Sequence, residues 1–230
     1  MTKALNNPIW NALTGKDQDK NIGTGEVAFL DAEIAPFIGM PRWDADSQRR
    51  LLDRVPPGRN WFLLLAEPVS FIPQWEVQVY LPLYQLVCGQ LASPPPLKHP
   101  AGIVPLGPEH VADMIALTAL TRPGPFATRT IEFGNYHGLF RDGRLVAMGG
   151  ERMHVGECTE VSAICTHPDY RGLGYGAAMT HYLSRLVLEK GQRPFLHARA
   201  DNVKAVEMYR KLGYDIRCDI HFYIFRSMNG

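Results

Sequence analysis

Apolar and polar residues follow a regular pattern from about residue 103 to residue 225, and this pattern predicts alternating strands and helices. Short, partly β-branched apolar runs predict strands at 103–106, 136–140, 145–148, 157–165, 195–198 and 216–225. Apolar residues at helical spacing predict helices at 108–120 and 175–190, and a shorter helix at 128–133. Asp142-Gly143 separates two of the strands and is a strong hairpin signal.

The first hundred residues carry a weaker pattern and no motif that indicates chemistry. They predict strands at 27–30, 61–66 and 74–79, a helix at 45–55, and a polar, loop-rich segment at 7–23. The run Ser93-Pro-Pro-Pro96 breaks regular structure, so we place a boundary there. The segment before it fits either a cap on the second half or an accessory layer that completes its core.

The most informative stretch is a short strand, a glycine-rich turn and the start of a helix, between Val161 and Ala177. Pro168 cannot donate to a strand ladder, so the strand should end before it. The glycines that follow, Gly172, Gly174 and Gly176, bring backbone amides together without Cβ atoms. A glycine turn that leads into a helix is a binding site for an anion, because unpaired amides and the positive end of the helix dipole converge there.

Spacing separates the common phosphate-binding turns. A P-loop would end in Gly-Lys-Ser/Thr, whereas this turn ends in Gly176-Ala177-Ala178. A dinucleotide fingerprint needs G-x-G-x-x-G, and position 177 is alanine. The sequence therefore disfavours a flavin or nicotinamide oxidoreductase. The remaining pattern, Arg/Gln-x-x-Gly-x-Gly/Ala, is met by Arg171, Gly174 and Gly176, and it resembles the pyrophosphate loop of the GNAT N-acetyltransferase superfamily.

A second motif strengthens this resemblance. The segment from Asp201 to Tyr214 is similar to the GNAT signature Asn-x-x-Ala-x-x-x-Tyr-x-x-x-Gly-Phe/Tyr. It is matched at Asn202, Ala205, Tyr209, Gly213 and Tyr214. The same segment predicts a helix, with Asp201 or Asn202 as its N-cap and Gly213 at its end. The resemblance covers about residues 102–226. It implies an α/β GNAT fold with a mixed, mostly antiparallel sheet and helices on both faces. The domains would be 101–230, the acetyltransferase, and 1–100, an α/β accessory region or a degenerate GNAT-like half.

The resemblance implies acetyl-CoA as cosubstrate, no metal, and direct acetyl transfer to a primary amine. Backbone amides of the turn would hold the pyrophosphate, Arg171 would add charge, and strand residues would pair with the pantetheine arm. A strand-end amide near Ser162–Ile164 would stabilise the oxyanion. The cofactor-binding residues implied are Ile164, Cys165, Thr166, Arg171, Gly172, Leu173, Gly174, Tyr175, Gly176, Ala177 and Asn202.

Three residues are catalytic candidates. Tyr209 matches the family tyrosine that returns a proton to the CoA thiolate, although it also fits the apolar face of its helix. Glu160 and His197 are alternative general bases. Each has a structural alternative as well: Glu160 as an ion-pair partner of Arg152 or Arg199, and His197 as a core histidine.

The amino-acid composition limits the binding partners and the cellular compartment that we expect for this protein. The 24 Lys and Arg residues nearly balance 23 Asp and Glu residues, so no bulk attraction to nucleic acid or membrane is expected. The four cysteines are scattered, which disfavours a zinc site or disulfide framework and fits the cytoplasm. We expect no signal peptide. The partners expected are acetyl-CoA, an unidentified amine and, since the superfamily often dimerises, a second copy of the chain. The competing function is a non-catalytic acetyl-CoA sensor.

Overall fold

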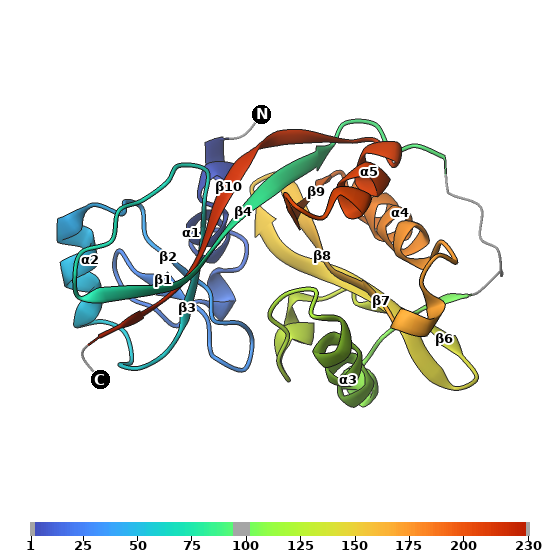
Figure 1. The fold of residues 1–230 in the computed structure, drawn as a ribbon, viewed down its shortest axis with the longest axis horizontal. Coiled ribbons are helices and arrows are strands. Elements are labelled where there is room, and N and C mark those ends of the chain that lie inside the picture. The colour runs from blue at the N-terminus through green and yellow to red at the C-terminus, as the bar shows by residue number, and fades with distance from the viewer. Residues whose placement is uncertain (1–2, 94–101, 229–230) are drawn as a thin grey trace.

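The computed structural model describes residues 3–93 and 102–228, so most of the predicted boundary at 93–96 lies outside the described residues (Figure 1). The described chain builds an eight-stranded sheet. Its strands, in spatial order, are β3 (Trp61–Leu65), β10 (Tyr214–Ser227), β4 (Trp75–Cys88), β9 (Arg193–Arg199), β8 (Cys158–Thr166), β7 (Arg144–Val155), β6 (His137–Arg141) and β5 (Ile103–Pro105). Neighbouring strands are antiparallel except β8 and β9, which are parallel, so the sheet is mixed and mostly antiparallel as predicted.

Helices cover both faces of the sheet. The helix α3 (Val111–Thr121) buries Met114 and Leu117 against Met148 on one face. The helix α4 (Tyr175–Glu189) buries Met179 and Leu183 against the other face. The last helix, α5 (Val203–Lys211), packs against α4 and β10. The chain order of strand, helices, three strands, helix, strand, helix, strand agrees with the order predicted for residues 103–225.

The hairpin between β6 and β7 turns at the predicted residues. Asp142 and Gly143 both have positive φ, 50° and 76°, which is the backbone of a type I′ turn. The short helix predicted at 128–133 is a 3₁₀ turn, η4 (Thr130–Phe133). Two further 3₁₀ turns, η3 (Pro108–His110) and η5 (Pro168–Tyr170), precede α3 and α4.

The N-terminal segment contains more helix than predicted. In place of a loop, residues 3–20 form η1 (Lys3–Asn6), α1 (Pro8–Leu13) and η2 (Gln18–Lys20). The helix α1 is six residues long, too short to show a periodic pattern, and Pro8 at its first turn reads equally well as a loop signal. The helix α2 (Ala45–Leu52) and a small sheet of β1 (Ala28–Phe29) and β2 (Ile38–Gly39) follow.

The strand β4 extends nine residues beyond its predicted end at Val79. The continuation contains Pro82, and proline cannot donate a hydrogen bond to a strand ladder. In the sheet, pairing with β9 begins at Leu83, so Pro82 lies one residue outside that pairing. Figure 1 shows β4 and β10 running side by side from the N-terminal half to the side that carries α5. The sheet therefore continues across residue 100, and the division into two domains stays a prediction.

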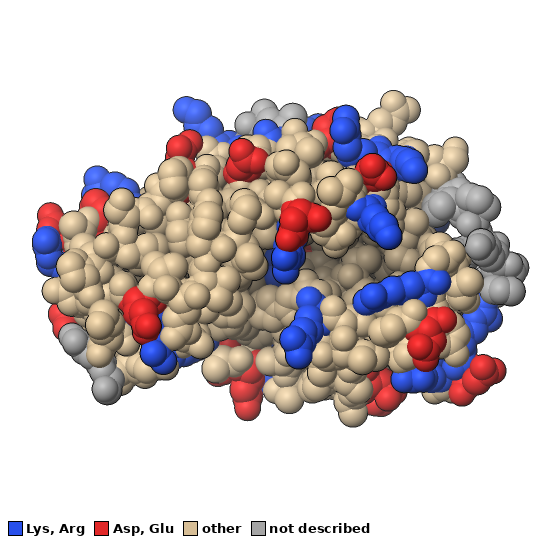
Figure 2. Space-filling model, viewed as in Figure 1, with Lys and Arg blue, Asp and Glu red and all other residues tan. Residues whose placement is uncertain are grey.

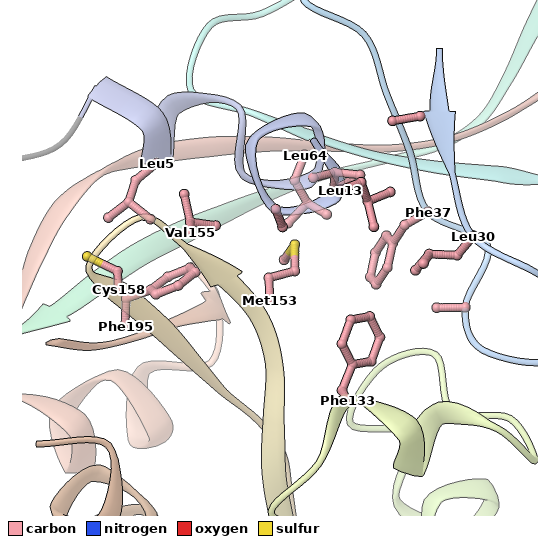
Figure 3. Close-up of a cluster of buried hydrophobic side chains, with 14 of the residues drawn as sticks. Leu5, Leu13, Leu30, Phe37, Leu64, Phe133, Met153, Val155, Cys158 and Phe195 are labelled. Carbon is pink, nitrogen blue, oxygen red and sulfur yellow. The ribbon is translucent and has the colours of Figure 1, made fainter. Parts of the chain in front are cut away.

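A buried apolar cluster joins the first residues of the chain to the centre of the sheet. Figure 3 shows Leu5 and Leu13 from the N-terminal segment beside Met153 and Val155 of β7 and Phe195 of β9. These five side chains are at most 2% exposed. Burying aliphatic and aromatic side chains to this degree stabilises each by about 1.5–3 kcal/mol. The N-terminal segment is thus part of the core beneath β7–β9.

Candidate functional site

The sheet opens between its two parallel strands. Pairing of β8 with β9 runs from Cys158↔Arg193 to Glu160↔Phe195 and ends there. Beyond this point β8 pairs with β7 and β9 pairs with β4, so the edges that the two strands turn toward each other have no strand partner. These two strands are the ones predicted at 157–165 and 195–198. Their divergence leaves backbone groups from Val161 onward open to a ligand that can pair like an added strand.

A bulge shapes β8 at the opening. Met148 pairs with Cys165 and Gly150 with Ser162, so two residues, Ala163 and Ile164, oppose one residue of β7. Ala163 has a φ of 55°, a backbone conformation that residues with a Cβ rarely adopt. Such strain persists where the surrounding structure holds it, and it is common at functional sites. The bulge lies within Ser162–Ile164, the segment predicted to supply an oxyanion donor.

The glycine-rich turn lies directly after β8 and opens α4. Gly172 and Gly174 have φ values of 76° and 89°, so the turn depends on glycine at both places. Within the described residues, none of the amides from Gly172 to Ala177 donates a turn or loop hydrogen bond. The first amides of an α-helix have no partner within the helix. The turn therefore presents a row of unpaired N–H groups at the positive end of the α4 dipole.

The predicted cofactor-binding residues differ in what their side chains do. Arg171 is exposed and makes no ion pair with another described residue, which leaves its charge available. Leu173 packs on the core beneath α4. Tyr175 is 2% exposed, and its hydroxyl accepts a 2.9 Å hydrogen bond from Arg141. Tyr175 can therefore offer a ligand its backbone amide and not its ring. Ala177 lies in the first turn of α4, partly buried against the α5 side.

The strand residues Ile164, Cys165 and Thr166 reach the opening through their backbone. The side chain of Ile164 points to α4, where it lies over Gly149. Cys165 points to α3, and burial raises the pKa of its thiol to about 11. A thiol with that pKa stays protonated near neutral pH, so it is a poor nucleophile. Thr166 places its hydroxyl next to Gly176 of the turn.

The helix α5 brings Asn202 and Tyr209 to the same side of the sheet. Asn202 caps the helix by accepting a hydrogen bond from the Ala205 amide. Tyr209 is 9% exposed, and its hydroxyl makes no hydrogen bond to another described residue. Burial raises the pKa of Tyr209 to about 12, so the phenol stays protonated at neutral pH. The structure thus holds a protonated donor in the cluster that α5 forms with β9 and with Ala177 of the turn.

Glu160 and His197 meet in a buried network. Arg152 donates two hydrogen bonds to the Glu160 carboxylate, from Nε at 2.7 Å and from Nη2 at 2.6 Å. His197 Nδ1 lies 2.7 Å from the same carboxylate. The remaining nitrogen, His197 Nε2, lies 3.0 Å from the amide nitrogen of Gln85, so it accepts while Nδ1 donates. Both predicted bases are therefore occupied by protein partners.

Electrostatics keep Glu160 ionised. Its side chain is 1% exposed, and burial alone would raise its pKa. The attraction of Arg152 and His197 outweighs that burial and lowers the pKa of Glu160 to about 2. A carboxylate with so low a pKa is a weak base near neutral pH. Arg199, the other partner considered for Glu160, pairs with Asp201 instead.

Sequence reasoning assigned no role to Tyr136, which the structure places beside the opening. Its ring lies over Gly150, the residue that pairs with Ser162 of β8. Its hydroxyl is buried without a hydrogen-bond partner. In the sequence Tyr136 is one more aromatic residue at the start of a strand, so no local signal distinguishes it.

Figure 2 shows that the face seen in Figure 1 is hollowed between the side that carries α5 and the side that carries α3, with basic side chains around the hollow. The residues that the structure describes contain no group of three His, Cys, Asp or Glu side chains arranged to hold a metal ion. In the described ranges no helix is long and apolar enough to cross a membrane.

Comparisons with known proteins support the fold and the family of this chain. A family model described as "FR47-like protein" matches residues 136–222. The fold is similar to the crystal structure of a putative GNAT-family acetyltransferase from Novosphingobium aromaticivorans, with a TM-score of 0.87 and 32% identity over 99% of this chain and 100% of that one. A search of curated protein sequences gave no match.

Two more distant structures share the fold alone. A GNAT-family acetyltransferase from Colwellia psychrerythraea has a TM-score of 0.53 and 14% identity over 94% of this chain and 96% of its own. A GCN5-related N-acetyltransferase-like protein from Streptococcus suis has a TM-score of 0.56 and 13% identity, with 87% of this chain and 84% of its own covered.

Proposed function

Because this chain belongs to the GNAT family of acetyltransferases, we propose that it moves an acetyl group from acetyl-CoA directly to a primary amine. The observation that carries the proposal is the combination of an amide-lined glycine turn with a sheet that opens next to it. The amides of Gly172 to Ala177 suit the two negative charges of the CoA pyrophosphate. Arg171 adds a positive charge at the rim.

The pantetheine arm would extend from the turn along the free edge of β8. Its amides can pair with the backbone of Ile164, Cys165 and Thr166 as an added strand does. Asn202, which caps the start of α5 shortly after β9 ends, is a proposed contact. The thioester would then reach the bulge at Ala163, where a backbone amide can donate to the developing oxyanion.

In the transfer step the amine nitrogen forms a bond to the thioester carbonyl carbon, and the C–S bond breaks. The amine loses one proton, and the departing thiolate takes one. Tyr209 is the proposed donor of the second proton, because its phenol is protonated and has no protein partner in the described chain.

The first proton needs a different route. Glu160 and His197 are the candidate bases from the sequence, but each already has protein hydrogen bonds, and Glu160 is a weak base. We propose that these two residues hold β7, β8 and β9 together where the sheet begins to open. The acceptor would then bind as the neutral amine, or lose its proton to water.

Thiol release from acetyl-CoA, measured across a panel of primary amines, tests the proposed function. We expect turnover with at least one amine and saturable binding of acetyl-CoA. Binding without turnover on any amine would favour the alternative, a sensor of acetyl-CoA. Absence of both would contradict the placement of CoA at this turn. A cytoplasmic location and a homodimer stay predictions.

A further inference from the structure

A small recess lies beside the bulge in β8, on the α3 face of the sheet. Its lining includes Gly124 from the loop after α3, Tyr136, Arg152, Ser162 and Ala163. Its volume is about 10 Å³, which is room for a single oxygen-sized group. The recess adjoins the strand segment where the thioester carbonyl is proposed to lie, so a group bound in it would belong to the acetyl acceptor.

The hydroxyl of Tyr136 is the unusual feature of this recess. Tyr136 is 2% exposed, and its hydroxyl has no hydrogen-bond partner. A buried hydroxyl without a partner destabilises a fold, and such groups are uncommon in native proteins. The ring is held firmly, since it packs over Gly150 and meets Phe126 edge to face at a centroid distance of 5.6 Å. A packing role alone would be filled as well by phenylalanine.

Arg152 adds a hydrogen-bond donor to the recess, and its positive charge is compensated by Glu160. Its Nε and Nη2 face Glu160, and Nη1 lies on the side of Gly124, with no hydrogen bond to a described residue. The Glu160 carboxylate compensates the guanidinium charge. The recess therefore offers N–H and O–H groups without a formal charge of its own. An ammonium group would meet the N–H donors of Arg152 and be disfavoured, and a carboxylate would bring an uncompensated buried charge.

We propose that this recess binds a neutral carbonyl oxygen of the acceptor, held by Tyr136, Ser162 and Arg152 Nη1, so that the substrate is an α-amino amide. This inference rests on the proposed function and names the substrate class for it. The carbonyl of the amide, one carbon away from the amine, anchors in the recess. The amine is then positioned at the thioester beside Ala163. Tyr136 acts here as a specificity-determining residue and takes no proton.

The test compares Tyr136→Phe with the wild type on two amines of similar size, alaninamide and isobutylamine. In the wild type kcat/KM is expected to be at least 10-fold higher for the amide. In Tyr136→Phe the value for the amide should fall about 10-fold, mainly through KM, while the value for the alkylamine stays unchanged. Tyr80→Phe, which removes an exposed hydroxyl on β4, is the matched control and should change neither.

Thermal unfolding separates the proposal from a structural role for the hydroxyl. Because the hydroxyl has no protein partner, Tyr136→Phe should keep or raise the Tm. A lower Tm would mean that a structural water satisfies Tyr136, and this would overturn the proposal. An equal loss of activity on both amines, or no loss on the amide, would overturn it too.

Binding of alaninamide to the CoA-loaded protein, followed by calorimetry, distinguishes this proposal from the proposed function. If the wild type acetylates no amine yet binds alaninamide at least 10-fold more tightly than Tyr136→Phe does, the acetyltransferase proposal fails and the recess proposal stands. If both bind equally, the recess proposal fails. Alanine in place of alaninamide tests the charge argument: tighter binding of the carboxylate would overturn the choice of a neutral group.

Discussion

His197 Nδ1 lies 2.7 Å from Glu160 Oε1, so the two residues predicted as alternative bases are hydrogen-bonded to each other. The pair lies where the parallel pairing of β8 with β9 ends. With Arg152 on the other side of the carboxylate, the network joins β7, β8 and β9. Its position indicates that it fixes the point from which the two strands diverge.

Glu160→Gln should destabilise the protein strongly. The substitution leaves the Arg152 guanidinium, 11% exposed, without its carboxylate. Breaking a buried ion pair in this way costs about 3–5 kcal/mol of unfolding free energy. Denaturant unfolding measures the loss. Asp201→Asn is the matched control, since it breaks an exposed pair with Arg199 and should change stability little. A small effect of Glu160→Gln would contradict the structural role.

Stability should fall as pH rises from about 6.5 to 9, because of His154. Its hydrogen bonds to Asp17 and Glu151 raise its pKa from 6.5 to about 9, although burial opposes this shift. The folded state therefore holds the proton more tightly than the unfolded state. The stabilisation is complete below the unfolded pKa and is lost as pH rises through the folded pKa.

The loss should be about 1–2 kcal/mol, less than the pKa difference alone implies, because the ring of His154 is 21% exposed. Urea unfolding at a series of pH values measures it. His154→Gln should flatten the curve between pH 6.5 and 9. If the stability of the wild type is already independent of pH in this range, the contacts with Asp17 and Glu151 do not raise the pKa of His154.

Gly176→Glu should abolish tight CoA binding without unfolding the protein. A Cβ at this position meets Thr166 Oγ1 at 3.7 Å, an ordinary contact, so a side chain fits. The carboxylate would face the pyrophosphate, and two like charges at close range should weaken binding about 100-fold. Gly174 is a poorer site for this test because its φ of 89° makes any side chain strained.

Calorimetric titration with CoA provides the measurement for the glycine turn. Gly176→Ala is the matched control: it adds the Cβ but no charge and should bind CoA nearly as the wild type does. Equal affinities for the wild type and Gly176→Glu would place the pyrophosphate elsewhere.

Tyr209→Phe should lower kcat by about 100-fold and leave the affinity for acetyl-CoA nearly unchanged. The reason is that Tyr209 donates to the thiolate only as it departs. Steady-state kinetics with thiol detection measures both quantities. The control is Tyr214→Phe, which removes a neighbouring hydroxyl that bonds Ser184 at 2.6 Å. That variant should lose stability and retain turnover, whereas a wild-type kcat in Tyr209→Phe would remove Tyr209 from the reaction.

Local sequence determined much of the C-terminal part. The glycine turn at 172–176 and the Asp142-Gly143 hairpin appear where they were predicted, and of the two predicted caps, Asp201 or Asn202, the structure has Asn202. Each depends on a residue type that a specific backbone conformation requires, so a few adjacent positions suffice to identify it. The family resemblance rested on two of these local motifs, and the full-length structural match agrees with it.

Tertiary contacts decided the rest. Whether Glu160 is a free base or an ion-pair partner depends on Arg152, which reaches it across a strand pair, and on His197, 37 residues further along the chain. The insertion of β4 between β9 and β10 joins residues separated by more than a hundred positions. The hydroxyl of Tyr136 is buried without a hydrogen-bond partner only because the strands and the loop after α3 enclose it. The sequence determines which side chains are present. Their burial and their hydrogen-bond partners, which set their pKa values and reactivity, arise only when distant segments pack together.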